Sequence, residues 1–240
     1  MKTYTLVILL LFMYVANAKE QDYNSLLIHG VYTKKIKIVQ QALLKGADPN
    51  KTIANNLSKF TPFIEAAGFG HYGIIKLMLK YNADVHKKGT ENYTVLHSVC
   101  ELCGSYDKYI EVYYLKKGII ISQKDRLKIL KLLIQKGANV NTQTKDGYTP
   151  LHYALKNKCF RISKILISLM DDVNIKDKIN VTPLHLAVKS QNVKIVKLLL
   201  KYGAKMPKSK HWKQVFIKRA CKNARTASQK KICALLQKKY

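Results

Sequence analysis

The sequence predicts an all-α protein, a solenoid of stacked helical hairpins, and three observations support this prediction. The phrase Thr-Pro-Leu-His-x-Ala occurs twice, in Gly147–Leu155 and in Asn180–Val188, with its threonines 33 residues apart. A second stretch with helical spacing of apolar residues follows each copy, and a Gly-Ala pair ends most of these stretches. A fixed period of this length is typical of repeat proteins, whose units bury their apolar faces against one another.

The first residues have the pattern of an export signal. Met1–Ala18 begin with the basic Lys2, continue through an apolar run at Leu6–Val15 and end in the small-x-small sequence Ala-Asn-Ala. The run is about half of the roughly 20 residues that a membrane-spanning helix needs. We expect cleavage between Ala18 and Lys19 and a secreted or periplasmic protein, with an uncleaved membrane anchor as the alternative.

Five copies of the repeat follow within residues 19–204. Thr61, Thr94, Thr149 and Thr182 open four of them, and Ser25 opens a more divergent first copy. The phase is kept only if the third copy contains a 22-residue insertion near residues 101–124. The predicted boundaries are 25–57, 58–90, 91–145, 146–178 and 179–204, followed by C-terminal capping helices over 205–240.

Each copy predicts two short helices and a turn. The first helix follows Thr-Pro, since a Thr hydroxyl caps a helix and Pro suits its first position. The second has the spacing seen in Ile195–Leu199 and stops at Gly203, a left-handed C-cap. A pair such as Asp146-Gly147 then predicts a tight turn toward the next unit.

These residues resemble the ankyrin repeat family from Ser25 to about Ala204. The resemblance implies a curved stack of helix pairs with finger-like hairpin turns. It also implies that His97, His152 and His185 tie neighbouring backbone together. A catalytic or metal-binding role for these histidines is the alternative, but their spacing gives them no partner residue.

Several positions depart from the family pattern. Gly30 stands where a packing Ala is expected, as in a terminal copy. Lys59, Asn92 and Asn180 replace the hairpin Gly seen at Gly147. Asn tolerates a left-handed conformation, whereas Lys is less suited to it.

Two sets of residues are candidates for partner binding. One residue precedes each Thr on the flank of the hairpin, which gives the ladder Phe60, Tyr93, Tyr148 and Val181. By family analogy the concave side is lined by Lys145, Lys156, Lys178 and Lys189. Packing between hairpins is the alternative role for the ladder, and we expect packing with partial exposure.

The insertion supplies a third candidate surface. It contains an amphipathic cluster of tyrosines, a residue type enriched at interfaces, at Tyr106, Tyr109, Tyr113 and Tyr114. A flap that packs over its own repeat explains the cluster equally well.

The charge is extreme, since 43 Lys and Arg face 14 Asp and Glu, for a net charge of +29, or +28 once Lys2 is removed with the leader. All the acids lie at or before Asp177, so the C-terminal segment is uniformly basic. This segment predicts either a solvated cap or a binder of anionic lipid, nucleic acid or acidic protein. Because 39 of the basic residues are Lys, an AT-rich genome also accounts for the excess.

Five unevenly spaced cysteines do not form the pattern of a small disulfide-stapled domain. Cys100 and Cys103 form a lone CxxC pair on expected helix positions, with no second pair to hold zinc. We therefore expect buried or half-buried thiols.

The function predicted first is a non-enzymatic interaction module, exported by a bacterium to bind another protein, such as a host protein, as a monomer without cofactor, metal or small-molecule substrate. Electrostatic binding of anionic surfaces through the basic C-terminal third is the alternative. An enzyme with the CxxC pair as redox centre is a third class. The sequence contains no paired carboxylates, glycine-rich phosphate loop or nucleophile–base signature that would support catalysis.

Overall fold

A computed structural model describes residues 23–52, 60–101, 103, 116, 125–206, 214, 217–218, 221 and 226–239. The predicted signal with its cleavage point at Ala18 and Lys19 lies outside the described residues. So do Lys59 and the four insertion tyrosines, Tyr106, Tyr109, Tyr113 and Tyr114.

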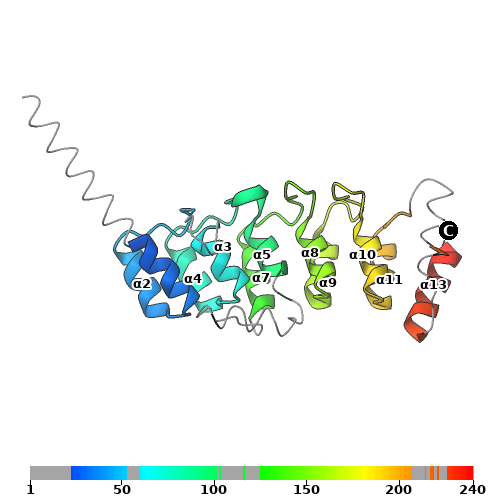
Figure 1. Ribbon diagram of the computed structural model, residues 1–240, viewed down its shortest axis with the longest axis horizontal. Helices are drawn as coiled ribbons and strands as arrows, with labels where there is room; N and C mark the ends of the chain where they lie inside the picture. The colour runs from blue at the N-terminus through cyan, green and yellow to red at the C-terminus, as the bar shows by residue number, and fades with distance from the viewer. Residues whose placement is uncertain are drawn as a thin grey trace, which may run out of the picture.

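The described helices stand in successive pairs (Figure 1). Residues 23–32 are helical and pair with α2 (Ile36–Leu44). The next pairs are α3 (Pro62–Gly68) with α4 (Tyr72–Lys80), α5 (Val95–Glu101) with α7 (Arg126–Gln135), α8 (Pro150–Lys156) with α9 (Phe160–Leu169), and α10 (Pro183–Lys189) with α11 (Val193–Lys201). A final helix, α13 (Ala227–Lys239), packs on α11, and a short 3-10 helix, η1 (Thr90–Asn92), precedes α5. The predicted all-helical stack of helix pairs is confirmed.

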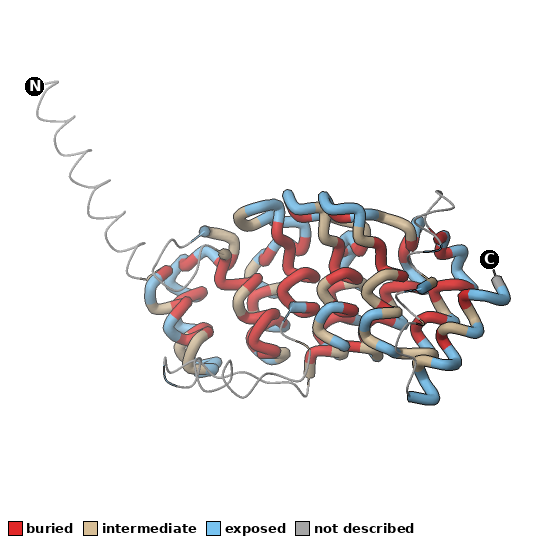
Figure 2. The backbone as a smooth tube through the Cα atoms, turned by 45° about the vertical axis from the view of Figure 1, so that its right-hand side comes forward, coloured by how far each residue is buried: buried red, intermediate tan, exposed pale blue. Residues whose placement is uncertain are grey.

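The pairs build two layers of helices. The first helices, α3, α5, α8 and α10, contact one another in order, as do the second helices, α2, α4, α7, α9 and α11. From α3 to α8 the first helices pack more closely than the second helices beside them, which places the first-helix layer on the concave side. Buried residues run as a band along the stack, and the turns that project from it are mostly exposed (Figure 2).

The Thr-Pro pairs begin the first helices as predicted. Thr61, Thr149 and Thr182 each accept a hydrogen bond from the backbone N–H three residues on, at 3.2, 3.4 and 3.4 Å. A proline occupies the first turn of each of these helices. Such a cap stabilises a helix by about 1 kcal/mol.

The repeat histidines connect one unit to the next. The Nδ1 atoms of His97 and His152 accept from the backbone N–H of Thr94 and Thr149 at 3.1 and 3.2 Å. Their Nε2 atoms lie 3.0 and 3.3 Å from the carbonyls of Tyr148 and Val181 in the following repeat. Because Nδ1 accepts, the proton of the neutral ring is on Nε2 and is donated to that carbonyl. The expectation that the repeat histidines tie neighbouring backbone together is confirmed for His97 and His152.

His185 repeats the first half of this arrangement. Its Nδ1 accepts from the backbone N–H of Thr182 at 3.2 Å and lies 2.7 Å from the hydroxyl oxygen of the same residue. The same residue types therefore cap the first helix of the fifth repeat.

Asparagines form a second link between repeats. An asparagine that follows the second helix of one repeat clamps the loop that follows the second helix of the next repeat. Asn50 donates to the carbonyl of Asn82 at 2.9 Å and accepts from the N–H of Asp84 at 2.7 Å. Asn174 makes the same two bonds to Gly203 and Lys205, at 3.1 and 2.7 Å.

The clamp changes where the fourth repeat has Met170-Asp171 in place of Gly-Ala. The amide of Asn141 donates to the carboxylate of Asp171 at 2.5 Å, and Asn141 Oδ1 is buried without a hydrogen-bond partner in the described structure. The backbone at Met170 is extended (φ −78°, ψ 140°) rather than left-handed. Without the glycine, this interface therefore lacks one of the two hydrogen bonds that the asparagine amide makes in the other clamps.

The expectation of free thiols is wrong for four of the five cysteines. Disulfides join Cys103 to Cys159 and Cys221 to Cys233, with Cα–Cα distances of 5.8 and 5.2 Å. Cys103 follows α5 and Cys159 precedes α9, so stacking of the third and fourth repeats brings together residues 56 positions apart. Cys100 is a buried thiol, and burial raises its pKa well above the usual range. Cys100 and Cys103 thus do not form the redox pair considered above.

Acid should destabilise the stack through its buried histidines. Burial lowers the pKa of His71 and of His97 from 6.5 to about 4, with the charge of Lys34 adding to the effect at His71. These two histidines therefore become protonated below about pH 6.5 in the unfolded chain, but only near pH 4 in the folded protein. The free energy of unfolding should fall through this window as the pH decreases, by up to about 3 kcal/mol per histidine.

Urea unfolding followed by circular dichroism at several pH values measures this effect. The variant His97→Gln should be less stable at neutral pH, yet its stability should depend less steeply on pH. An unchanged pH slope in the variant would contradict the assignment.

Candidate functional site

Hairpin turns, here called fingers, project from the stack beside the first helices (Figure 1). In the fourth and fifth repeats the fingers close by hydrogen bonds from Thr144 to Tyr148 and from Asp177 to Val181, at 2.9 and 3.0 Å. The fingers and the exposed side of the first helices together form the finger face, which is the candidate functional site.

Left-handed residues form the finger tips. Asn92, Gly147 and Asn180 have φ angles of 59°, 82° and 64°. The two asparagines thus adopt the conformation for which the sequence predicted them. A Cβ at Gly147 would lie 2.8 Å from the Cα of Asp177. Gly147 is therefore required both by its backbone angle and by the next finger.

Adjacent fingers are hydrogen-bonded side by side. The N–H of Lys145 donates to the carbonyl of Glu91 at 2.8 Å, and that of Lys178 donates to Asp146 at 2.9 Å. Their ammonium groups also pair with the carboxylates of the same two acids, at 3.2 and 3.7 Å. These four side chains are mostly exposed, so each ion pair contributes less than about 1 kcal/mol. Lys145 and Lys178 thus lie on the finger row and hold it in register.

Part of the predicted apolar ladder forms a stack of aromatic rings. The rings of Phe60 and Tyr93 are stacked with their centroids 4.8 Å apart. Tyr93 is buried, and its hydroxyl donates to the carboxylate of Glu101. Phe60, Tyr148 and Val181 are half-buried. The ladder therefore packs between fingers and leaves part of its surface exposed.

Tyr153 completes the aromatic strip, although the sequence pattern alone did not single it out. It lies on α8 and meets Tyr93 and Tyr148 edge to face, at centroid distances of 5.7 and 5.6 Å. The signal was present, because Tyr153 occupies the variable position of Thr-Pro-Leu-His-x-Ala, on the surface side of the helix. Phe60, Tyr93, Tyr153 and Tyr148 thus form one aromatic strip across three repeats.

The phenols of the strip stay protonated at neutral pH. Burial, then the negative charge of Glu101, raises the pKa of Tyr93, and the same two causes raise the pKa of Tyr153 to about 12. Burial and the charge of Asp177 raise the pKa of Tyr148. The half-buried Tyr148 and Tyr153 therefore present protonated hydroxyls beside ring surface.

The charge of the finger face changes sign along the stack. Glu101, Lys156 and Lys189 occupy the same position of successive repeats, at the end of each first helix, and all three are exposed. The ammonium of Lys156 lies 5.7 Å from the centre of the Tyr148 ring. The third repeat is thus acidic where the fourth and fifth are basic.

Val181, the last member of the ladder, adds no ring to the aromatic strip. It is half-buried, and its carbonyl is engaged by His152. The structure brings together Phe60, Tyr93, Tyr148 and Lys156, pairs Lys145 and Lys178 with acids, and leaves Lys189 at the end of the face.

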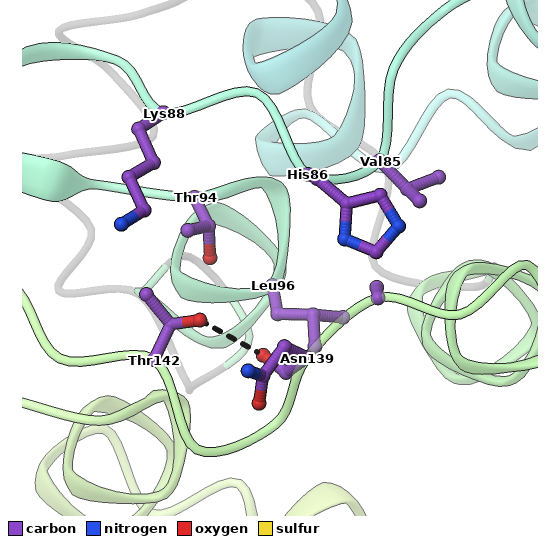
Figure 3. Close-up of a pocket in the computed structure, with 8 residues that line it drawn as sticks. Val85, His86, Lys88, Thr94, Leu96, Asn139 and Thr142 are labelled. Carbon is purple, nitrogen blue, oxygen red and sulfur yellow. Dashed lines mark hydrogen bonds between the residues drawn. The ribbon is translucent and has the colours of Figure 1, made fainter.

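A cavity of about 150 Å³ lies between the turns of the second and third repeats (Figure 3). His86 and Lys88 line one side, and Asn139 and Thr142 line the other. His86 occupies the position at which Asn50 and Asn174 clamp the next loop. Its backbone makes the same turn, with the N–H donating to Asp84 Oδ1 at 2.8 Å. The cavity lies where an asparagine would otherwise reach across.

Two features that would indicate other functions are absent from the described part of the chain. No group of His, Cys, Asp and Glu is arranged to hold a metal ion there. None of the described helices has both the length and the apolar character needed to cross a bilayer.

Comparison with known proteins identifies the repeats. The family model for ankyrin repeats in three copies matches residues 118–210, and that for a single ankyrin repeat matches residues 58–90. A fowlpox virus (strain NVSL) ankyrin repeat protein, FPV223, is 31% identical over 114 residues, which cover 43% of this chain and 80% of the viral protein. The chain belongs to the ankyrin repeat family.

Other relatives contain ankyrin repeats within longer proteins. Alpha-latrocrustotoxin-Lt1a of Latrodectus tredecimguttatus is 29% identical over 125 residues, 52% of this chain but 7% of the toxin. The fowlpox ankyrin repeat protein FPV222 is 29% identical over 134 residues, 52% of this chain and 18% of that protein. The chain thus spans a small part of these relatives, and the similarity concerns the repeats. Ankyrin repeat proteins are usually non-enzymatic binding proteins, and their repeats are typically protein-binding modules.

Restoring the clamp should stabilise the interface between the second and third repeats. The variant His86→Asn can donate to the carbonyl of Gly137 and accept from the N–H of Asn139, as Asn174 does at a later interface. We expect the free energy of unfolding to rise by about 1 kcal/mol. Urea unfolding measures it, with His86→Ala as the control that offers neither bond. Equal stabilities for the Asn and Ala variants would show that no clamp forms.

Proposed function

We propose that this ankyrin repeat protein is an exported, non-enzymatic module that binds another protein through its finger face. The aromatic strip is the single observation that carries this proposal. Four aromatic rings from three repeats lie in contact, three of them half-buried, on a row of fingers fixed by hydrogen bonds. Aromatic side chains that are already held in place lose little conformational entropy on binding.

The charges of the finger face give the partner an orientation. Glu101 favours a basic group near the third repeat, and Lys156 and Lys189 favour acidic groups over the fourth and fifth. A partner segment with basic and acidic ends would bind in one direction and be disfavoured in the other.

Export is supported by two observations. The residues before Lys19 have the composition of a cleavable signal. Two disulfides join described cysteines, and disulfides persist in oxidising compartments outside the cytoplasm.

Electrostatic binding through the basic C-terminal third is the second candidate function. It is favoured by exposed lysines on α13, such as Lys230, Lys231 and Lys238, in a segment without acidic residues. Salt distinguishes the two candidates, because binding driven by charge collapses as salt rises, whereas binding through aromatic contacts persists.

Truncating either half-buried tyrosine of the aromatic strip should weaken partner binding. Affinity capture with the mature chain at low and moderate salt, followed by mass spectrometry, identifies the partner. For that partner we expect Tyr148→Ala and Tyr153→Ala each to weaken binding roughly tenfold or more, as for aromatic hot spots. Tyr202→Ala is the matched control, since Tyr202 is 44% exposed but follows the second helix α11. Equal losses from all three variants, or none, would refute the finger face as the site.

Export has a separate test. A reporter fused behind residues 1–18 should leave the cytoplasm of the producing cell. Peptide mapping of the exported protein without reductant should recover the Cys103–Cys159 and Cys221–Cys233 pairs. A reporter retained inside the cell, or a protein with all five thiols free, would refute export without affecting the binding proposal.

A further inference from the structure

A second surface of the molecule carries an ordered array of positive charge. It is formed by the exposed side chains of the second helices α2, α4, α7, α9 and α11, and it is called the cation face here. None of these five helices contains an acidic residue. The acids among the described residues of the repeats lie on the first helices, on the fingers and in the loops. The cation face is therefore distinct both from the finger face and from the basic C-terminal segment.

The first turn of the second helices supplies one row of cations. The residues are Lys37 on α2, Lys128 on α7, Arg161 on α9 and Lys194 on α11, all exposed. One acid of the described structure neutralises part of this row, since Asp125 pairs with Lys128 at 3.0 Å. Adjacent packed helices lie about 10 Å apart, so the row places its charges at regular steps from α7 to α11, with a gap at α4, where Gly73 holds the equivalent position.

A second row lies one turn further along the same helices. It consists of Lys76 on α4, Lys131 on α7, Lys164 on α9 and Lys197 on α11, again all exposed. Each member on α7, α9 and α11 is three residues after its counterpart in the first row and therefore lies on the same side of its helix. The two rows form a band of cations that runs along the long axis of the solenoid.

Helix stability does not account for the first row. The N-terminal turn of a helix carries a partial positive charge, so cations there are disfavoured and acids are preferred. Lysines at the other end of the second helices, such as Lys80 and Lys201, have the favourable position. The first-row cations are thus placed against the preference of their own helices, which indicates a role other than folding.

We propose that the cation face binds a linear sulfated polysaccharide of the heparin type. Such a polymer carries its sulfates and carboxylates on successive sugar rings, so it can follow the band from repeat to repeat. The second-helix layer lies on the outer side of the curved stack. A flat membrane would touch an outward-curved face over few repeats, whereas a flexible chain can bend with it.

The residue types favour a polysaccharide over nucleic acid. Single-stranded nucleic acid is bound by aromatic side chains on which its bases stack. The described second helices carry two aromatics beside the rows, Tyr72 and Phe160, and both are half-buried. Tyr72 lies between Lys76 and Lys128, with each ammonium about 6 Å from its ring. Seven of the eight cations in the rows are lysines, which act as point charges and lack the planar fork of Arg that reads bases and grips phosphates.

The test compares two variants in which the same amount of charge is removed. The first, Arg161→Gln, Lys164→Gln, Lys194→Gln and Lys197→Gln together, removes both rows from α9 and α11. The second, Lys218→Gln, Lys230→Gln, Lys231→Gln and Lys238→Gln together, removes four exposed cations from the C-terminal segment. Binding of size-fractionated heparin to the full mature chain is followed by fluorescence anisotropy over a series of salt concentrations.

We expect the first variant to bind heparin roughly tenfold or more weakly. Its salt dependence should become shallower, with the slope of log Kd against log salt decreasing by up to about one for each ammonium–sulfate pair removed. The second variant should keep most of the affinity. The melting temperature of the first variant should stay the same or rise, because two of its substitutions relieve unfavourable first-turn charges.

Three results would overturn the proposal: equal heparin binding by the wild type and the first variant, a larger reduction in the second variant, or tighter binding of double-stranded DNA or phosphatidylserine vesicles than of heparin. The finger-face variants Tyr148→Ala and Tyr153→Ala should bind heparin normally. Failure of this proposal is therefore distinguishable from failure of the protein-binding function.

Discussion

The interface between consecutive repeats is the constraint on which this structure depends, and a neutral histidine stands at its centre. His97 and His152 each accept from the helix cap of their own repeat and donate to a carbonyl of the next. The same ring thus completes a helix start and fixes the distance to the following unit. Asn50 and Asn174 repeat this logic on the loops that follow the second helices. An isolated helix pair would leave these polar groups and its apolar side without partners.

Much of this arrangement can be predicted from local sequence. The remainder depends on which positions of adjacent repeats are brought together. Thr149 and Pro150 predict a helix start, and Gly147 predicts a left-handed turn, because each acts through its own backbone. Cys103 and Cys159 are 56 residues apart and pair only because the repeat spacing and the insertion place them in adjacent, equivalent turns. Counted from the Thr of each repeat, Cys103 and Cys159 stand nine and ten residues on, near the same turn of adjacent units. The residues of the predicted leader and most of the insertion lie outside the part of the chain that the structure describes.

The candidate site was likewise predictable in part, because its repeat positions follow from the sequence whereas its contacts between fingers do not. The ladder that includes Phe60 and Tyr148 follows from position in the repeat, as does the left-handed Asn180. The ion pairs of Lys145 and Lys178 were missed, because the acids that they meet belong to the preceding finger. In a repeat protein, each exposed position occurs once per repeat and so forms a row along the stack. The composition of a row, more than any single residue, therefore determines what a face of the solenoid can bind.

The Cys103–Cys159 bond also affects how the array responds to force or heat. A solenoid frays from its ends, since a terminal unit has a neighbour on one side only. A covalent link between the third and fourth units stops this fraying from separating the middle of the chain. Pulled at its two ends, the protein would yield stepwise from its outer units while the central pair stayed joined. Cleavage of the backbone anywhere between the two bridged cysteines would leave both fragments attached.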